Sequence, residues 1–285
     1  GGWHHMTHAY WESCKQGACD ERFAQVTLDQ FRDWVADVPD PNNKKSSVYE
    51  AWRPIEAGGR LVRGGAFMQV YHLLMDSPYC SDDDLITLLR SVVEHADYIA
   101  EYPDYGSNHL LHAIEGLYTA GAYFPELSRA QYWRERASQL ALDEYHVQFL
   151  PDGSHYEFAP AYHVESLNGI LSIPHLATHF GRMDELPAGF VDGVEHSLEY
   201  LMSIVGPDGD FLWKNDAWNS AADSFFQEHA NLFPQRSDFQ WVATQADDRL
   251  KPNVTSFFHD WSGLYVSRDQ WGVDGSLVAF DAVLL

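Results

Sequence analysis

The segment from Pro151 to Ile170, PDGSHYEFAPAYHVESLNGI, concentrates side chains that can move protons. Asp152-Gly153 predicts a turn, and we expect a helix after it. The titratable side chains that follow the turn are His155, Tyr156, Glu157, Tyr162, His163 and Glu165. Histidine, glutamate and tyrosine are residue types that act as general acids and bases. Tyr162 is our first candidate for a catalytic residue, although a polar helix entrance with two half-buried tyrosines would give the same pattern.

A second polar cluster begins at Asn108 and His109, with His112 one turn later. It opens the segment NHLLHAIEGLYTAGAY, which predicts a helix over residues 108–123 after a Tyr105-Gly106-Ser107 turn. In the first turn of a helix, exposed polar side chains meet the positive end of the helix dipole. An anionic group could be held there. The alternative is that Asn108 only caps the helix.

Several residues could contact an anionic or sugar-like ligand. In WRPIEAGGRLVR, Arg53, Arg60 and Arg63 form the densest positive patch of an acidic chain, and Trp52 precedes them. Arginine binds carboxylate or sulfate in bidentate fashion, but the same residues could form ordinary ion pairs with neighbouring acids.

The predicted loop GPDGDFLWKNDAWN adds Trp213, Lys214 and Trp218 as candidates for contact with a sugar. A loop that packs on helix ends would have the same composition. We also place His163 and Glu157 among the candidate substrate contacts.

The charge balance excludes some ligands. The chain has 285 residues, with 18 Lys and Arg against 42 Asp and Glu, for a net charge of −24. Nucleic acids and anionic membranes are therefore not expected partners, and no apolar run approaches the roughly 20 residues that span a bilayer. An anionic polymer could still bind where the few basic residues gather in one cleft.

The cysteines and histidines suggest no metal site. Cys14 and Cys19 could form a local bridge in an oxidising compartment, and Cys80 is expected to be a buried thiol. The cluster His4, His5 and His8 is more typical of a solvated terminus than of a ligand set. We assign no metal ligands, we expect no required cofactor, and we leave a structural divalent metal open.

Periodicity predicts a mainly α chain that ends in strands. The expected helices span residues 26–38 (with Thr27 as N-cap), 54–75, 81–102, 108–123, 127–149, 156–180, 191–205 and 219–233, with a loop at 40–47. After Pro252 the apolar period changes to two, which predicts strands within 256–261, 262–271 and 275–285. We therefore expect a helical domain over 1–252 and the first strands of a β domain over 253–285. Helical hairpins in this number could form a bundle, a superhelix or a closed toroid.

Residues 124–170, FPELSRAQYWRERASQLALDEYHVQFLPDGSHYEFAPAYHVESLNGI, resemble the heparinase II/III polysaccharide lyases, most closely the heparinase III (heparan-sulfate lyase) type. The resemblance continues in the same order through WRPIEAGGR, NHLLHAIEGLYTAG, PDGDFLWKNDAW and SGLYVSRDQW. It implies an incomplete (α/α) toroid followed by an antiparallel β-sandwich. It also implies cleavage of uronic-acid polysaccharides by β-elimination, in the periplasm or outside the cell.

The resemblance also implies roles for individual residues. Asn108 would contact and neutralise the substrate carboxylate, with His109 assisting, and Tyr162 would transfer protons. A further catalytic histidine of this family lies in the β-sandwich, in a segment that would follow residue 285. The chain is accordingly expected to be part of a longer protein, and the general base is either Tyr162 or that histidine, with His163 and His109 as fallback bases.

Elimination suits these residue types because removing the C5 hydrogen of a uronate builds negative charge beside a carboxylate. A hydrogen-bond donor such as an amide spreads that charge. A tyrosine phenol has a reference pKa of about 10, so it can serve as an acid without any shift.

Four hypotheses for the function remain open from the sequence alone. The preferred one is a lyase acting on a lightly sulfated heparan sulfate, and the second is a lyase for alginate or another uronan. The third is a glycoside hydrolase that uses a carboxyl pair drawn from Glu157, Asp208 and Asp216. The fourth is a non-catalytic glycan-binding toroid. Oligomeric state is not predicted.

Overall fold

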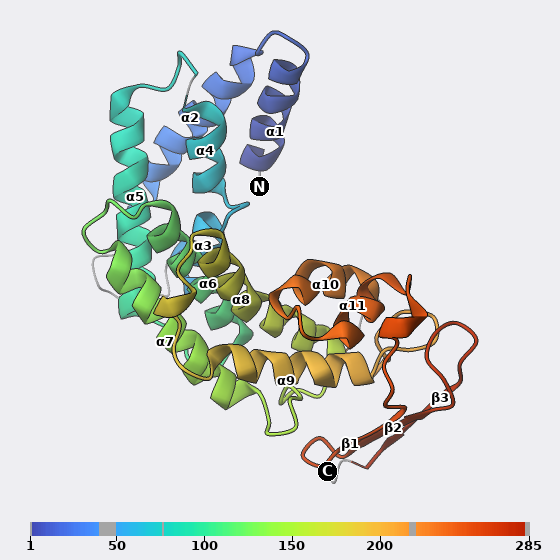
Figure 1. Ribbon diagram of the computed structural model, residues 1–285. Helices are drawn as coiled ribbons and strands as arrows, with labels where there is room; N and C mark the ends of the chain where they lie inside the picture. The colour runs from blue at the N-terminus through green and yellow to red at the C-terminus, as the bar shows by residue number, and fades with distance from the viewer. Residues whose placement is uncertain (1, 40–49, 76, 217–220, 283–285) are drawn as a thin grey trace. The chain divides into compact units, whose positions relative to one another are not determined.

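The computed structural model describes residues 2–39, 50–75, 77–216 and 221–282. The chain divides into two compact units, Gly1–Leu140 and Ala141–Leu285, and the division falls inside helix α7 (Ala130–Gln148). Both units are mainly helical, and the strands lie at the C-terminal end of the second (Figure 1). The expectation of a mainly α chain ending in strands is confirmed.

The first unit is built from helices that pack side by side. Its elements are α1 (Gly2–Lys15), α2 (Glu21–Asp37), η1 (Glu50–Trp52), α3 (Pro54–Leu61), α4 (Ala66–Leu74), α5 (Asp82–Glu101) and α6 (Asn108–Tyr123). Helix α1 lies along α2, and α3 lies along α6 (Figure 1). Leu28, Phe31, Phe67, Val92 and Leu117 are completely buried between these helices. Burial of such apolar side chains is the main source of stability of the unit.

Local sequence explains where α5 and α2 begin. Ser81 accepts a hydrogen bond from the backbone N–H of Asp84, whose carboxylate accepts one from the backbone N–H of Ser81, which forms a capping box as the SDDD sequence predicts. For α2 the predicted cap was wrong. Asp20 caps the helix, whereas Thr27 lies buried within it and its hydroxyl donates to the carbonyl of Phe23 at 2.8 Å.

The single helix predicted over 54–75 is two helices, α3 and α4. Gly64 and Gly65 lie in the break between them. Glycines also set the packing of α3 on α6, because a Cβ on Gly58 would lie 2.5 Å from Ala113 Cα and one on Gly116 would lie 2.4 Å from the Gly58 carbonyl oxygen. Only glycine permits two helix backbones to approach so closely.

The second unit continues from α7 through α8 (Pro160–His179), η2 (Met183–Glu185), α9 (Phe190–Ser203), α10 (Ala222–His229), η3 (Ala230–Leu232), α11 (Ser237–Thr244) and η4 (Asp248–Leu250). Helix α8 begins at Pro160 rather than at residue 156, because proline fits the first helical position. The predicted helix over 219–233 begins in undescribed residues, and the predicted loop at 40–47 also lies outside the described ranges.

A three-stranded antiparallel sheet follows the helices. Strands β1 (Ser256–His259), β2 (Leu264–Arg268) and β3 (Leu277–Asp281) pair in sequence order, with Phe257 opposite Val266 and Val266 opposite Ala279. Burial alternates along β2, as the period-two pattern predicts. The sheet belongs to the same compact unit as α8 to α11, and the proposed domain boundary at 252/253 stays a prediction.

Two further features concern the cysteines and the apolar length of the helices. Cys14 and Cys19 form a disulfide, whereas Cys80 is a free thiol that is only half-buried. None of the described helices is long and apolar enough to cross a membrane.

Candidate functional site

Asn108 and His109 occupy the first turn of α6. Ser107 precedes them in an extended conformation as the N-cap, but its side chain makes no capping hydrogen bond. Asn108 is therefore not the cap. Its side chain is half-buried and that of His109 is exposed. The close contact between α3 and α6 fixes the helix that carries them, so both polar groups are presented at the positive end of a rigid helix.

Tyr162 lies in the first turn of α8 and is half-buried. The chain reaches this helix through a tight turn, in which Gly153 has a φ of +80° and donates from its backbone N–H to the carbonyl of Leu150 at 2.8 Å. The left-handed conformation explains why Asp152 is followed by glycine. Tyr162 and Asn108 thus occupy equivalent positions, each near the N-terminus of a helix, in different units.

A buried aromatic and imidazole cluster lies beside the start of α8. His163 stacks on Tyr200 with ring centroids 5.3 Å apart, and Tyr200 meets His259 at 4.5 Å. His163 is only 1% exposed, and burial, followed by the nearby His155, lowers its pKa well below the usual range. The suggested roles of His163 as a substrate contact or a fallback base are therefore corrected, because in this arrangement it is an internal, neutral side chain.

His155 is also internal. Its Nε2 lies 3.3 Å from the side-chain oxygen of Gln148 and 3.2 Å from Ser166 Oγ, and burial lowers its pKa to about 4. Glu157 follows it in the turn before α8, where its backbone N–H donates to His155 Nδ1 at 3.4 Å and its side chain is half-buried. Glu157 is thus placed closer to solvent than His163, which is compatible with a substrate contact.

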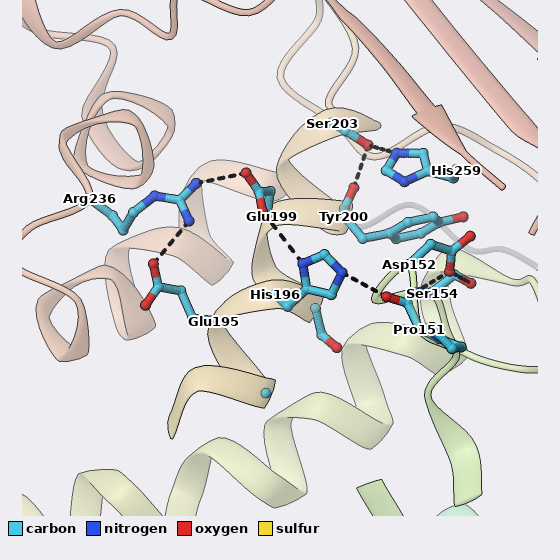
Figure 2. A network of polar contacts seen from close by, with 12 residues as sticks. Pro151, Asp152, Ser154, Glu195, His196, Glu199, Tyr200, Ser203, Arg236 and His259 are labelled. Carbon is cyan, nitrogen blue, oxygen red and sulfur yellow. Dashed lines mark hydrogen bonds and ion pairs between the residues drawn. The ribbon is translucent and has the colours of Figure 1, made fainter. Parts of the chain in front are cut away.

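A polar network joins the turn before α8, helix α9 and the sheet (Figure 2). Asp152 Oδ1 accepts hydrogen bonds from the backbone N–H and the hydroxyl of Ser154, and Oδ2 accepts from the backbone N–H groups of Trp261 and Ser262. Nearby, Ser203 Oγ donates to the carbonyl of Tyr200 and lies 2.7 Å from His259 Nε2. Asp152 therefore connects the turn that leads to Tyr162 with the connection between β1 and β2.

Sequence reasoning missed this network, because the Asp-Gly pair predicts only a turn at Asp152. Its carboxylate also borders an open cavity of about 330 Å³, together with His196, Glu199, Phe258 and Trp261. His196 Nε2 lies 3.0 Å from the carbonyl oxygen of Pro151, and its Nδ1 lies 3.5 Å from the carboxylate of Glu199 (Figure 2). The only sequence signal for this region is the Asp-Gly turn itself.

The loop after α9 holds the predicted sugar contacts in different environments. The side chain of Trp213 is 70% exposed and so is available to a ligand. Lys214 forms a 3.0 Å ion pair with Asp281 of β3 and lies 5.5 Å over the ring of Phe158, so its charge is directed into the protein. Trp218 lies outside the described residues.

The positive patch predicted in the first unit is dispersed. Trp52 is 2% exposed and packs on His95 with ring centroids 4.2 Å apart, so the expected sugar contact is a core residue instead. Arg53 is exposed and pairs with Glu56 at 2.6 Å, which is the ordinary ion pair considered as the alternative. Arg60 is half-buried and donates to His95 Nε2 at 3.0 Å, whereas Arg63 is exposed.

Within the described ranges, no group of three or more histidine, cysteine, aspartate or glutamate side chains could hold a metal ion. The N-terminal histidines His4, His5 and His8 lie on α1, with ring centroids 5.7 Å apart for the first pair and 6.5 Å for His4 and His8. They form no such group.

The sequence and the fold of this chain are similar to those of known proteins. Two proteins named heparin-sulfate lyase, from Bacteroides stercoris and Pedobacter heparinus, are each 26% identical over 92% of this chain, which spans 42% and 40% of their lengths. A solved mutant of the heparan sulfate lyase HepC from Pedobacter heparinus matches 98% of this chain with a TM-score of 0.83 and 25% identity, over 43% of its own chain. A solved heparinase III has a TM-score of 0.84 and 26% identity, with 98% of this chain and 46% of its own covered.

These matches agree with the toroid fold that the family resemblance implies. The sequence model of the Heparinase II/III N-terminus matches residues 2–241, which is most of the chain. The chain therefore belongs to the Heparinase II/III N-terminus family.

Proposed function

We propose that this chain is part of a polysaccharide lyase that cleaves heparan sulfate by β-elimination. The observation that carries the proposal is the match over 92% of the chain to proteins named heparin-sulfate lyase. Because the chain spans less than half the length of these relatives, the activity proposed is that of the whole protein. The disulfide between Cys14 and Cys19 supports a periplasmic or secreted location, where such bonds persist.

In this proposal, Asn108 donates hydrogen bonds to the uronate carboxylate. As the C5 hydrogen leaves, negative charge builds next to that carboxylate, and a fixed donor in a helix first turn stabilises it. One such donor is typically worth about 3 to 4 kcal/mol in the transition state. His109, exposed in the same turn, assists in holding the carboxylate.

Tyr162 acts as the general acid that protonates the departing glycosidic oxygen. A phenol is ordinarily protonated at pH 7, so this role needs no special environment. The base is either Tyr162 itself or a histidine of the whole protein that lies outside residues 1–285. The buried His163 is not assigned this role, because a side chain that is only 1% exposed cannot reach a sugar.

Substrate contacts are assigned to residues that the structure leaves accessible. Trp213 offers a ring face to a sugar, and Glu157 lies in the turn before Tyr162. The acidic balance of the chain favours a lightly sulfated polymer over densely sulfated heparin.

Ultraviolet absorbance tests the proposal, because elimination leaves a conjugated double bond in the product and hydrolysis does not. The intact protein is mixed separately with heparan sulfate, heparin, alginate and hyaluronan. We expect absorbance to rise with heparan sulfate. A rise with alginate alone would change the substrate, and reducing ends formed without absorbance would identify a hydrolase.

A further inference from the structure

A second pocket lies in the first unit, and its lining includes neither Asn108 nor Tyr162. It has a volume of about 400 Å³ and is lined by Trp3, Trp34, Gly59, Arg60, Gly64 and Gln69, among others. An arginine, an amide and two indoles at one concave surface make up the kind of lining that orients a polar ligand on apolar walls.

The Arg60 guanidinium is held by neutral groups. Its Nε donates to His95 Nε2 at 3.0 Å, and its Nη2 donates to the carbonyl of Ala51. His95 Nδ1 lies 2.7 Å from the carbonyl of Ser91, so this nitrogen carries the proton and Nε2 accepts. Burial, and then the charge of Arg60, lowers the pKa of His95 well below its usual range. The imidazole is therefore neutral and does not offset the charge of Arg60.

The neighbouring acid, Glu56, forms its ion pair with Arg53 and not with Arg60. Glu56, one turn earlier in α3, binds Arg53 at 2.6 Å and acts on Arg60 only through its electric field. Burial lowers the pKa of Arg60 to about 10, with Glu56 opposing the change, so Arg60 remains charged at pH 7. A half-buried cation whose hydrogen-bond partners are neutral is stabilised when an oxyanion approaches it.

The indoles of Trp3 and Trp34 give the pocket aromatic walls on which a sugar ring can pack. Arg60 lies 4.8 Å over Trp34, and Trp3 meets Trp34 edge to face with centroids 6.2 Å apart. Gln69 is fixed by Thr7 Oγ1, which donates to its Oε1 at 2.7 Å, and by its own Nε2, which donates to the carbonyl of Gly64 at 2.6 Å. Indole faces beside a guanidinium can bind the apolar face and the charged substituent of one acidic sugar.

We propose that this pocket is a second carbohydrate site, which holds a sugar unit of the polymer through a carboxylate or sulfate group on Arg60. The class of sugar rests on the function proposed above, but the site does not include Asn108 or Tyr162. This second site binds the polysaccharide without cleaving it, and so adds affinity for long substrates.

Two glycines allow the pocket to be filled without touching Arg60. A Cβ on Gly59 or Gly64 would meet no heavy atom within 4 Å, and neither residue has the positive φ that disfavours a side chain. Gly59→Leu therefore projects a side chain from the pocket lining, and Gly59→Ala is its matched control, with the same backbone effect and little added volume. Gly64→Leu fills the same pocket from the other glycine in case the first variant is poorly folded.

Binding of heparan sulfate and unsulfated heparosan tetrasaccharides is measured by calorimetry in the intact protein, in a Tyr162→Phe background that prevents turnover. We expect two binding events, one of which Gly59→Leu and Gly64→Leu weaken about tenfold, the loss of one charge-assisted contact, with Gly59→Ala within twofold of the parent for both events. Weakening for both sugars indicates a carboxylate on Arg60, and weakening for heparan sulfate alone indicates a sulfate.

Equal affinities in the leucine and alanine variants, with unchanged urea midpoints, would overturn the second site. The absorbance assay on the wild-type protein is independent of this result. If the leucine variants bind normally and the wild type still gives an absorbance rise, the second site is wrong and the lyase function is unaffected. If the leucine variants bind weakly and the wild type gives no absorbance rise, the lyase function is wrong and the second site is unaffected.

Discussion

Asp152 and Ser262 lie 110 positions apart in the chain, yet Asp152 Oδ2 accepts a 2.7 Å hydrogen bond from the backbone N–H of Ser262. Burial would raise the pKa of Asp152, but the hydrogen bonds from Ser154 and Ser262 outweigh it and hold the pKa below its usual value. The carboxylate is therefore ionised at neutral pH, and its hydrogen bonds to Trp261 and Ser262 tie the turn before α8 to the β1–β2 connection.

Replacing this carboxylate should destabilise the second unit. In Asp152→Asn, one acceptor oxygen becomes an NH₂ donor that faces the N–H groups it once accepted from. We expect the free energy of unfolding to fall by about 2 kcal/mol, as for other charged hydrogen bonds. Urea denaturation measures this change in the free energy of unfolding. Asp260→Asn, at an exposed position near the same connection, is the control, and an equal loss in both variants would contradict the role of Asp152.

The buried histidines predict an acid-sensitive fold. Burial lowers the pKa of His155 to about 4 and, together with His175, that of His229 to about 3. The unfolded chain protonates these groups near pH 6.5, so it binds more protons than the folded chain below that value. Stability is thus fully present above about pH 6.5 and falls as the pH drops towards 4, with His155 contributing about 3 kcal/mol of the change.

Urea denaturation between pH 7.5 and 4.5 checks this expectation. His155→Gln keeps a polar side chain beside Gln148 and Ser166 but removes the titration, so its stability should depend less on pH over this range. His146→Gln, exposed on α7, should keep the full dependence. A flat wild-type profile would show that His155 is not held neutral by the fold.

The carboxylate-binding role of Asn108 predicts a specific kinetic effect. Asn108→Ala should lower kcat and kcat/KM together, by about 100- to 1,000-fold, because the lost hydrogen bond matters most in the transition state. Steady-state rates on heparan sulfate measure this. Asn231→Ala, at an exposed position in η3, should match the wild type. A raised KM with unchanged kcat would instead assign Asn108 to ordinary substrate binding.

Charge predicts the preferred substrate. With 42 acidic residues against 18 basic ones, the protein should turn over lightly sulfated heparan faster than heparin of similar length. Initial absorbance rates on the two polymers at matched disaccharide concentration make the comparison, and repeating them at higher salt should narrow the difference. Faster cleavage of heparin would mean that local basic residues, rather than net charge, govern selection.

Elements with strong local signals could be predicted from the sequence. The Ser81 capping box marks the start of α5, and period-two alternation places β2 where Leu264 and Val266 turn inward. The predicted start of α8 is too early. Residues 156–159 fit the helical pattern, but proline prefers the first helical position, and α8 therefore begins at Pro160.

The surroundings of the site residues depend on tertiary contacts and could not be predicted in the same way. Trp52 was expected to meet a sugar, yet it packs against His95 on a different helix. Asp152 carries the sequence signal of a turn residue, whereas its partners Trp261 and Ser262 follow more than 100 positions later. Residue type identified which groups can do chemistry, but burial decided which of them remain accessible.

The most direct test of the proposed elimination compares the wild type with Tyr162→Phe on heparan sulfate by ultraviolet absorbance. The variant loses only the phenolic oxygen, so oligosaccharide binding should change little while kcat falls by about 100- to 10,000-fold. Tyr156→Phe, an exposed tyrosine in the preceding turn, should retain wild-type rates. Near-normal turnover by Tyr162→Phe, with the same unsaturated product, would contradict its role as the general acid.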